Sequence, residues 1–87
     1  MATVEIYTWQ FCPYCLRAKA LLKQKGIDFE EHPIDGDPEA RSKMADRAEG
    51  RNTLPQIFIN NKGIGGCDEL YALNDNNLLN ELLEMKN

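Results

Sequence analysis

The sequence predicts a single α/β domain in which a four-stranded mixed sheet is flanked by helices. Its 87 residues leave room for one hydrophobic core, and an apolar content of 43% is enough to build a modest one. The patterns along the chain run strand, helix, strand, helix, strand, strand, helix. This order joins a parallel pair to an antiparallel hairpin, and we expect helices on both faces of the sheet.

The first strand and the first helix come before Gly26. Residues Thr3–Thr8 alternate β-branched side chains with polar and aromatic ones, which is typical of a strand. Over Pro13–Lys25 apolar residues recur among basic ones at helical spacing. Gly26 then stands where helices commonly end, so we expect the helix to stop there.

A second strand and a second helix are expected next. Ile27–Glu30 alternates apolar and acidic residues and predicts the strand. Asp37 followed by Pro38 is typical of a helix start, because aspartate caps free N–H groups and proline suits the first helical position. The helix before Gly50 is supported by apolar residues spaced by four, namely Ala40, Met44 and Ala48.

The last third of the chain predicts a hairpin followed by helices. Pro55–Ile59 is a short apolar strand, Asn60–Gly63 supplies turn chemistry, and Ile64–Gly66 returns. A helix is expected from Cys67 and Asp68 onward. A final helix after an asparagine-rich interruption depends on the apolar residues Leu78, Leu79, Leu82, Leu83 and Met85.

Charge argues against a nucleic-acid partner, and the lack of a long apolar stretch argues against a membrane helix. Acidic residues number 14 and basic residues 10, and no block of lysine or arginine stands out, so we expect no nucleic acid. No apolar stretch approaches the roughly 18 residues that a membrane helix needs. The start of the chain lacks both a charged leader and a long apolar run. We therefore expect a cytoplasmic protein that keeps its N-terminus.

The segment Cys12-Pro13-Tyr14-Cys15 is the strongest chemical signal. A C-x-x-C pair between a strand and a helix places its first sulfur at the helix N-terminus, where partial positive charge and unpaired N–H groups favour a thiolate. Pro13 stiffens the first turn, so the two sulfurs can close a small disulfide ring. We expect Cys12 to act as nucleophile and the less exposed Cys15 to act as resolving thiol.

Zinc binding is the alternative for this cysteine pair. Four-coordinate zinc needs two further ligands, and only Cys67 and His32 remain, without the usual paired spacing. We therefore predict no metal site. A purely structural disulfide is even more disfavoured than zinc, because a reducing compartment keeps such pairs as thiols.

Four segments in this order resemble the glutaredoxin family, in particular its small bacterial two-cysteine type. They are Cys12-Pro13-Tyr14-Cys15, Thr53-Leu54-Pro55, Gly65-Gly66 and Cys67-Asp68. The likeness covers nearly the whole chain. It implies a thioredoxin-like fold for one domain over residues 1–87, a cis peptide between Leu54 and Pro55, and a glutathione groove beside Cys12.

The resemblance also implies a function. It indicates a glutathione-dependent thiol–disulfide oxidoreductase that reduces protein disulfides and glutathione mixed disulfides, with glutathione as reducing co-substrate and no tightly bound cofactor. Its partners would be glutathione and disulfide-containing or glutathionylated proteins, and it would be a monomer. The alternative is a protein that holds an iron–sulfur cluster between two chains through Cys12 and glutathione. Relatives devoted to clusters usually have glycine and serine in place of Pro13 and Cys15, so the sequence favours the enzyme.

By the same resemblance, Thr53, Leu54, Pro55 and Gly66 belong to the glutathione groove. A cis X–Pro bond costs only about 0.5–1 kcal/mol over trans, so a loop can hold it and expose backbone groups to an extended peptide. Those groups would pair with the cysteinyl part of glutathione. Alternatively, Pro55 only opens a strand, and Gly65-Gly66 only forms a bulge or tight turn.

The rest of the groove is expected at a helix start. The N–H groups at Cys67 and Asp68 suit the γ-glutamyl carboxylate, with the Asp68 side chain facing the amine. Asp68 is alternatively a simple N-cap, and Cys67 a small buried hydrophobe. Tyr14 would cover the glutathione or else pack on the surface. Arg51 would pair with the glycyl carboxylate or remain a solvated cation at a helix end.

Trp9 departs from the family pattern. Family members commonly carry a lysine shortly before the cysteine motif, and Trp9 stands at that place here. The positive charge that such a lysine offers to Cys12 and to a ligand carboxylate is lost. We expect Arg51, Lys19 or the helix N-terminus to compensate.

Overall fold

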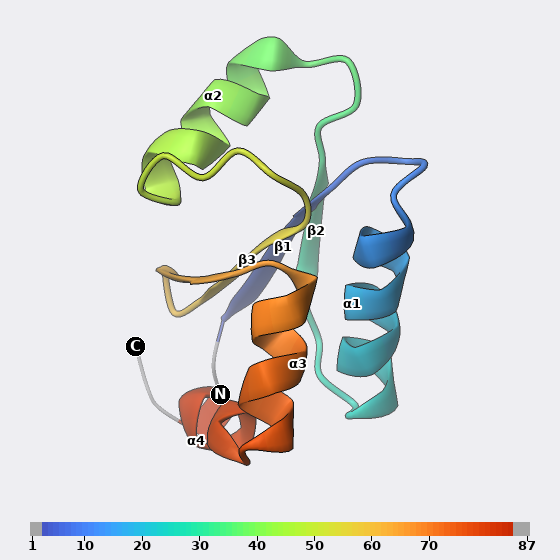
Figure 1. Cartoon of the computed structure of the whole chain (residues 1–87), viewed down its shortest axis with the longest axis vertical. Helices are drawn as coiled ribbons and strands as arrows, with labels where there is room; N and C mark the ends of the chain where they lie inside the picture. The colour runs from blue at the N-terminus through green and yellow to red at the C-terminus, as the bar shows by residue number, and fades with distance from the viewer. Residues whose placement is uncertain (1–2, 85–87) are drawn as a thin grey trace.

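The computed structural model describes residues 3–84, which form four strands and four helices (Figure 1). The elements are β1 (Val4–Thr8), α1 (Pro13–Gln24), β2 (Glu30–Pro33), α2 (Pro38–Arg47), β3 (Gln56–Ile59), β4 (Lys62–Gly65), α3 (Cys67–Asp75) and α4 (Leu78–Glu84). This order confirms the predicted one, including the final helix, although Met85 lies outside the described residues. None of the helices in this described part is long and apolar enough to cross a membrane.

The four strands form one mixed sheet, as predicted. Their order is β2-β1-β3-β4, with β1 and β2 parallel and the other two pairs antiparallel. In the centre, Ile6 lies opposite Ile57 and Val4 opposite Ile59. Because side chains alternate along a strand, these aliphatic residues share one face of the sheet.

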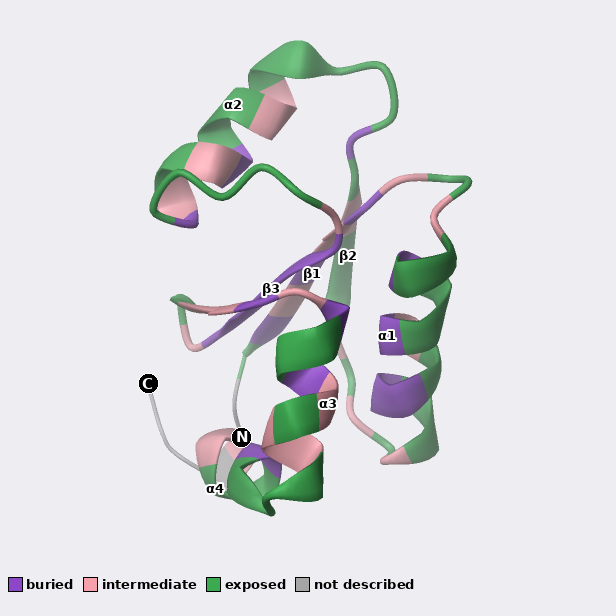
Figure 2. Ribbon diagram, in the orientation of Figure 1, coloured by how far each residue is buried: buried purple, intermediate pink, exposed green. Residues whose placement is uncertain are grey.

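Helices α1, α3 and α4 cover this aliphatic face. Their buried residues Leu22, Leu70 and Leu79 join the strand residues in one hydrophobic cluster. Figure 2 shows α1 buried along one side and exposed along the other. Since α1 follows β1 after a short loop, packing α1 against the sheet fixes the cysteine motif at the carboxyl end of β1.

The opposite face carries polar and aromatic side chains and contacts Arg47 of α2. The Arg47 guanidinium carbon lies 4.1 Å from the ring centroid of Phe58, and its nitrogens donate to both Glu5 carboxylate oxygens at 3.1 Å. Arg47 also donates to the Tyr7 hydroxyl at 2.9 Å, while His32 Nε2 lies 3.1 Å from Glu5 Oε2. Helices therefore flank both faces, as expected, but through different kinds of contact.

The position of the second strand differs from the prediction. We expected it at Ile27–Glu30, whereas β2 begins at Glu30, where pairing with β1 starts. The Ile27 N–H donates to the Leu22 carbonyl at 2.9 Å, so it caps the C-terminal end of α1 and does not enter the sheet ladder. Ile27 and Phe29 pack against the core as connecting residues. Their alternation reflects that partial burial and not a ladder of strand hydrogen bonds.

The hairpin between β3 and β4 turns more tightly than predicted. Asn60 and Asn61 both have positive φ, 53° and 67°, and Ile59 pairs with Lys62. This is the two-residue type I′ geometry whose twist matches the flanking strands. β4 therefore starts at Lys62, within the stretch that we had assigned to the turn.

Candidate active site

Cys12 occupies the N-cap position of α1. Its backbone is extended, with φ −120° and ψ 103°, and Pro13 takes the first helical position, as predicted. The Cys15 N–H donates to Cys12 Sγ at 3.2 Å. The same sulfur lies 3.9 Å from the carbonyl oxygen of Leu54. Both cysteines are free thiols, so the structure describes the reduced pair.

The two thiols have different surroundings. Cys12 is half-buried, whereas Cys15 is only 1% exposed. Burial, together with the hydrogen bond to Cys12, raises the pKa of the Cys15 thiol to about 12. Lys19, one turn further along α1, opposes this rise and is held by Glu31 at 3.0 Å. Glu31 in turn accepts the Thr8 hydroxyl at 2.6 Å.

The loop facing Cys12 contains the expected cis peptide between Leu54 and Pro55. Gln56 follows it at the start of β3 and is buried. Its Nε2 donates to Thr53 Oγ1 at 3.1 Å, which fixes the Thr53 side chain. Gln56 was not among the site residues predicted from the sequence. A polar residue inside an apolar strand is the sequence pattern that could have indicated it, because a buried polar side chain needs a hydrogen-bond partner.

The start of α3 lies next to this loop. Gly66 is the N-cap, and Glu69 Oε1 accepts the Gly66 N–H at 2.7 Å. The alternative interpretation of Asp68 as N-cap was therefore wrong. A Cβ on Gly66 would lie 3.1 Å from the Pro55 carbonyl oxygen, so glycine allows the two segments to approach. Cys67 is buried, which raises the pKa of its thiol.

A groove of about 310 Å³ opens between these segments. Cys12 does not line it, but its sulfur lies beside it, 3.9 Å from the carbonyl oxygen of the lining residue Leu54. Its lining residues are Tyr14, Thr53, Leu54, Pro55, Gly66, Cys67, Asp68 and Glu69. Every one of them except Glu69 was assigned to the site from the sequence. Glu69 stands three residues after Gly66, the spacing of a capping box, which is the signal that would have found it. The contact of these residues with glutathione stays a prediction.

Arg51 does not line this groove. Its Nε donates to the Ala48 carbonyl at 2.9 Å, and a Cβ on Gly63 would lie 3.0 Å from its Nη2. The side chain therefore packs between the end of α2 and the hairpin. The pairing of Arg51 with a ligand carboxylate stays a prediction, and Arg51 lies outside the groove.

A cation from α2 packs on Trp9. The Arg41 guanidinium carbon lies 5.5 Å from a Trp9 ring centroid. Arg41 also donates twice to the Asn52 carbonyl, from Nε at 3.1 Å and from Nη2 at 2.8 Å. Arg41 thus joins the two loops that flank Cys12. We had expected only Arg51, Lys19 or the helix start near this place.

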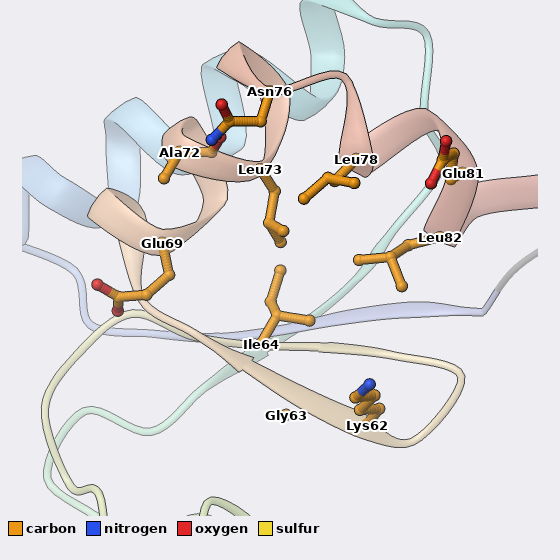
Figure 3. A pocket seen from close by; sticks show the side chains of 10 residues that line it. All are labelled: Lys62, Gly63, Ile64, Glu69, Ala72, Leu73, Asn76, Leu78, Glu81 and Leu82. Carbon is orange, nitrogen blue, oxygen red and sulfur yellow. The ribbon is translucent and has the colours of Figure 1, made fainter.

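A larger cavity, of about 520 Å³, lies elsewhere, between β4 and helices α3 and α4 (Figure 3). Ile64, Leu73 and Leu82 point toward one another across it. None of the residues that line it is a cysteine or a histidine. The candidate active site is therefore the smaller groove, whose lining residue Leu54 has its carbonyl oxygen 3.9 Å from the Cys12 sulfur.

The fold and the site together define a class of protein. The class is that of thiol–disulfide oxidoreductases with the thioredoxin-like fold. Its features here are a cysteine pair at a helix start, a neighbouring cis-proline loop and a four-stranded mixed sheet. The glutaredoxin family model matches residues 4–64. The chain belongs to the glutaredoxin family.

Individual relatives agree with this assignment. Glutaredoxin 3 of Escherichia coli is 57% identical over 84 residues, which are 97% of this chain and 100% of that protein. The solution structure of a glutaredoxin from Brucella melitensis is 54% identical with a TM-score of 0.84, and the match covers 97% of this chain and 90% of that one. The crystal structure of a buckwheat glutaredoxin–glutathione complex is 26% identical with a TM-score of 0.82, covering 94% and 76%.

Proposed function

We propose that this protein uses glutathione to reduce protein disulfides and glutathione mixed disulfides, with Cys12 as nucleophile and Cys15 as resolving thiol. The observation that carries the proposal is the groove beside Cys12, whose sulfur accepts an N–H from the first turn of α1. Such donors, together with the helix N-terminus, hold a sulfur anion. Glutathione is the reducing co-substrate in this proposal, and no cofactor is tightly bound.

The first step is a thiol–disulfide exchange. The Cys12 thiolate attacks the glutathione sulfur of a mixed disulfide. A bond forms between Cys12 Sγ and that sulfur, the original S–S bond breaks, and the substrate thiolate leaves and takes up a proton. The glutathione moiety then lies in the groove, next to the backbone of Thr53 and Leu54.

The second step regenerates Cys12. A second glutathione thiolate attacks the sulfur of the bound glutathione, which forms glutathione disulfide and releases the Cys12 thiolate. A protein disulfide takes a different route, in which Cys15 attacks the mixed disulfide at Cys12. Because its pKa is raised to about 12, Cys15 must lose its proton as it attacks. Two glutathione molecules then reduce the Cys12–Cys15 disulfide.

The glutathione in this proposal is supported by two observations. The buckwheat relative was solved as a complex with glutathione. In this chain the groove offers the backbone of an extended loop on one side and the first turn of α3 on the other. We further propose that the protein acts as a monomer in the cytoplasm on glutathionylated or disulfide-bonded proteins.

The test is glutathione-dependent reduction of the mixed disulfide between glutathione and 2-mercaptoethanol, coupled to NADPH through glutathione reductase. We expect turnover by the wild type, none by Cys12→Ser, and retained turnover by Cys15→Ser, because glutathione itself releases the first intermediate. A wild type without turnover would overturn the proposal. Iron and acid-labile sulfide would then be measured to examine the cluster alternative.

A further inference from the structure

Helix α1 carries a lysine at the edge of the side that faces the core. Its buried residues Cys15, Ala18 and Leu22 recur at helical spacing. Lys19 stands four residues after Cys15 and three before Leu22, and only 21% of its side chain is exposed. Because a lysine head group is strongly hydrated, a largely covered lysine next to a buried cysteine needs partners there.

The Lys19 ammonium is held by β2 and, through it, by β1. Its Nζ donates to Glu31 Oε2 at 3.0 Å, and the same oxygen accepts the Thr8 hydroxyl at 2.6 Å. Thr8 is only 1% exposed, so this hydroxyl is fixed inside the fold. The hydrogen bond from Thr8 is also the largest cause that keeps the pKa of Glu31 below its usual range. Glu31 is therefore a carboxylate at neutral pH and holds the ammonium at one place.

The position of Lys19 on the helix brings its charge to Cys15. Helical side chains lean toward the N-terminus, so Lys19 reaches back over the turn that contains Cys15. At this spacing the Cβ atoms lie about 5–6 Å apart. The backbone of Trp9, which directly follows Thr8, forms a hydrogen bond with the Cys15 thiol. Burial raises the pKa of Cys15, while the Trp9 backbone and the Lys19 charge oppose this rise.

The charges around Cys15 change during the reaction. The side chains of β1 that face α1 are uncharged, and from α3 Cys67 faces the core as a thiol whose pKa is raised by burial. In the reduced protein Cys12, next to burial, raises the pKa of Cys15. Once Cys12 is bound in a mixed disulfide it carries no charge, whereas Lys19 keeps its own. The Lys19 ammonium then favours the Cys15 thiolate without opposition from Cys12.

We infer that Lys19 is a positioning residue that stabilises the Cys15 thiolate in the step where this sulfur resolves a mixed disulfide at Cys12. The inference rests on the proposed function and adds the group that assists Cys15. In this step Cys15 gives its proton to solvent, and its sulfur forms a bond with Cys12 Sγ. The bond between Cys12 Sγ and the substrate sulfur breaks, and the substrate thiolate leaves and takes up a proton. Glu31 and Thr8 keep Lys19 in place throughout.

The experiment follows the two cysteines separately in one reaction. Reduced protein is mixed with an equal amount of dithiobis(nitrobenzoic acid), whose coloured thionitrobenzoate is recorded by stopped flow. Cys12 releases the first equivalent and keeps the other half of the reagent as a mixed disulfide. Cys15 then releases the second equivalent and closes the Cys12–Cys15 disulfide. Cys15→Ser should release one equivalent only, which assigns the second release to Cys15.

Lys19→Met should slow the second release about threefold at neutral pH, because a roughly tenfold smaller thiolate fraction is partly offset by the higher nucleophilicity of a more basic thiolate. The pH profile of this release should move to higher pH, which a merely structural loss would not cause. Lys19→Arg keeps the charge and should restore the second release. Lys23→Met removes the same charge from the exposed side of α1, one turn further along, and should leave the second release unchanged.

The first release separates this inference from the proposed function. A wild type without a first release would overturn the proposed function itself, and a wild type that stops after one equivalent would overturn both. If the wild type releases both equivalents while Lys19→Met and Lys23→Met behave alike, only the inference fails. A second release as slow in Lys19→Arg as in Lys19→Met would also overturn it, since the charge would then not matter. Should circular dichroism show Lys19→Met to be unfolded, Lys19→Gln takes its place with the same expected result.

Discussion

The two faces of the sheet are closed by different interactions, although the same strands build both. On one face Val4 and Ile6 of β1 meet the aliphatic residues of α1 and α3. On the other, Glu5 and Tyr7 of the same strand meet Arg47 of α2. The first contact is non-directional and depends on apolar area, while the second depends on charge and on hydrogen-bond geometry.

Because of this difference, the two faces of the sheet should respond differently to acid, salt and the loss of apolar area. The cysteine motif begins α1 and so depends on the aliphatic face for its position. Acid and salt act on the α2 face, where the pKa of Glu5 is lowered chiefly by its hydrogen bond with Arg47. We therefore expect the redox site to keep its geometry under conditions that weaken the Arg47 network.

The largest effect should come from breaking the aliphatic face. Leu22→Ala removes a fully buried side chain from the cluster, and the free energy of unfolding should fall by about 3 kcal/mol. Urea denaturation measures this. Leu16→Ala on the exposed side of the same helix is the control and should change stability by at most about 0.5 kcal/mol. Similar losses in both variants would show that α1 is not held by this face.

Breaking the α2 face should cost less. Arg47→Met leaves Glu5 without its guanidinium partner and should lower the free energy of unfolding by about 1–2 kcal/mol, since Arg47 is only partly buried. This loss should shrink in high salt, unlike that of Leu22→Ala. Lys43→Met removes the exposed Lys43–Glu39 pair of the same helix and should cost only about 0.3 kcal/mol.

The pH dependence sharpens the comparison further. The pKa of Glu5 is lower in the folded protein than its ordinary value of 4.5, so its stabilisation is present above that value and is lost as the pH falls through the folded pKa. The stability difference between wild type and Glu5→Gln should thus shrink as the pH falls below 4.5 and through the lowered pKa of Glu5. The pKa of Glu31 is also lowered, chiefly by the Thr8 hydroxyl. Because Glu31 is present in both proteins, its contribution cancels in the stability difference. A constant difference from neutral to acid pH would contradict the role of Glu5.

The smallest effect concerns a single hydrogen bond. Tyr7→Phe removes the hydroxyl that accepts from Arg47 and keeps the ring contacts with His32 and Phe58. We expect a loss of about 0.5 kcal/mol in the free energy of unfolding. In the Arg47→Met background the same substitution should have no effect, because the donor is already gone. An unchanged effect there would mean that the hydroxyl stabilises through another partner.

The fold was largely predictable because local patterns carry it. The alternation in β1, the cap at Asp37 and the asparagine turn each gave the correct kind of element. The second strand was misplaced because partial burial of Ile27 and Phe29 produces the same alternation as a strand. The Arg47 network had no local signal, since Glu5 and Arg47 are 42 residues apart and meet only in three dimensions.

The candidate site was predictable to the extent that motifs mark it. Cys12 and Cys15 follow from spacing and helix chemistry, and the groove residues followed from family resemblance. Arg41 was missed because its partners, Trp9 and the Asn52 carbonyl, lie in other segments. Gln56 contacts Thr53, only three residues away, and was missed although a polar residue stood within an apolar strand. Arg51 was placed near the groove by its position in the chain, but its hydrogen bond to Ala48 turns it elsewhere.

The ends of the strand order, β2 and β4, also have a consequence for the protein in crowded solution. Because the Ile34 N–H bonds back to Thr8, Pro33 takes an outward position, where it offers no N–H to an arriving strand. β4 is only four residues long, begins with Lys62, and faces an irregular register at Ile57 and Phe58. Both edge strands of the sheet thus disfavour hydrogen-bonded pairing with a strand of another chain, the kind of pairing that leads to amyloid-like aggregation.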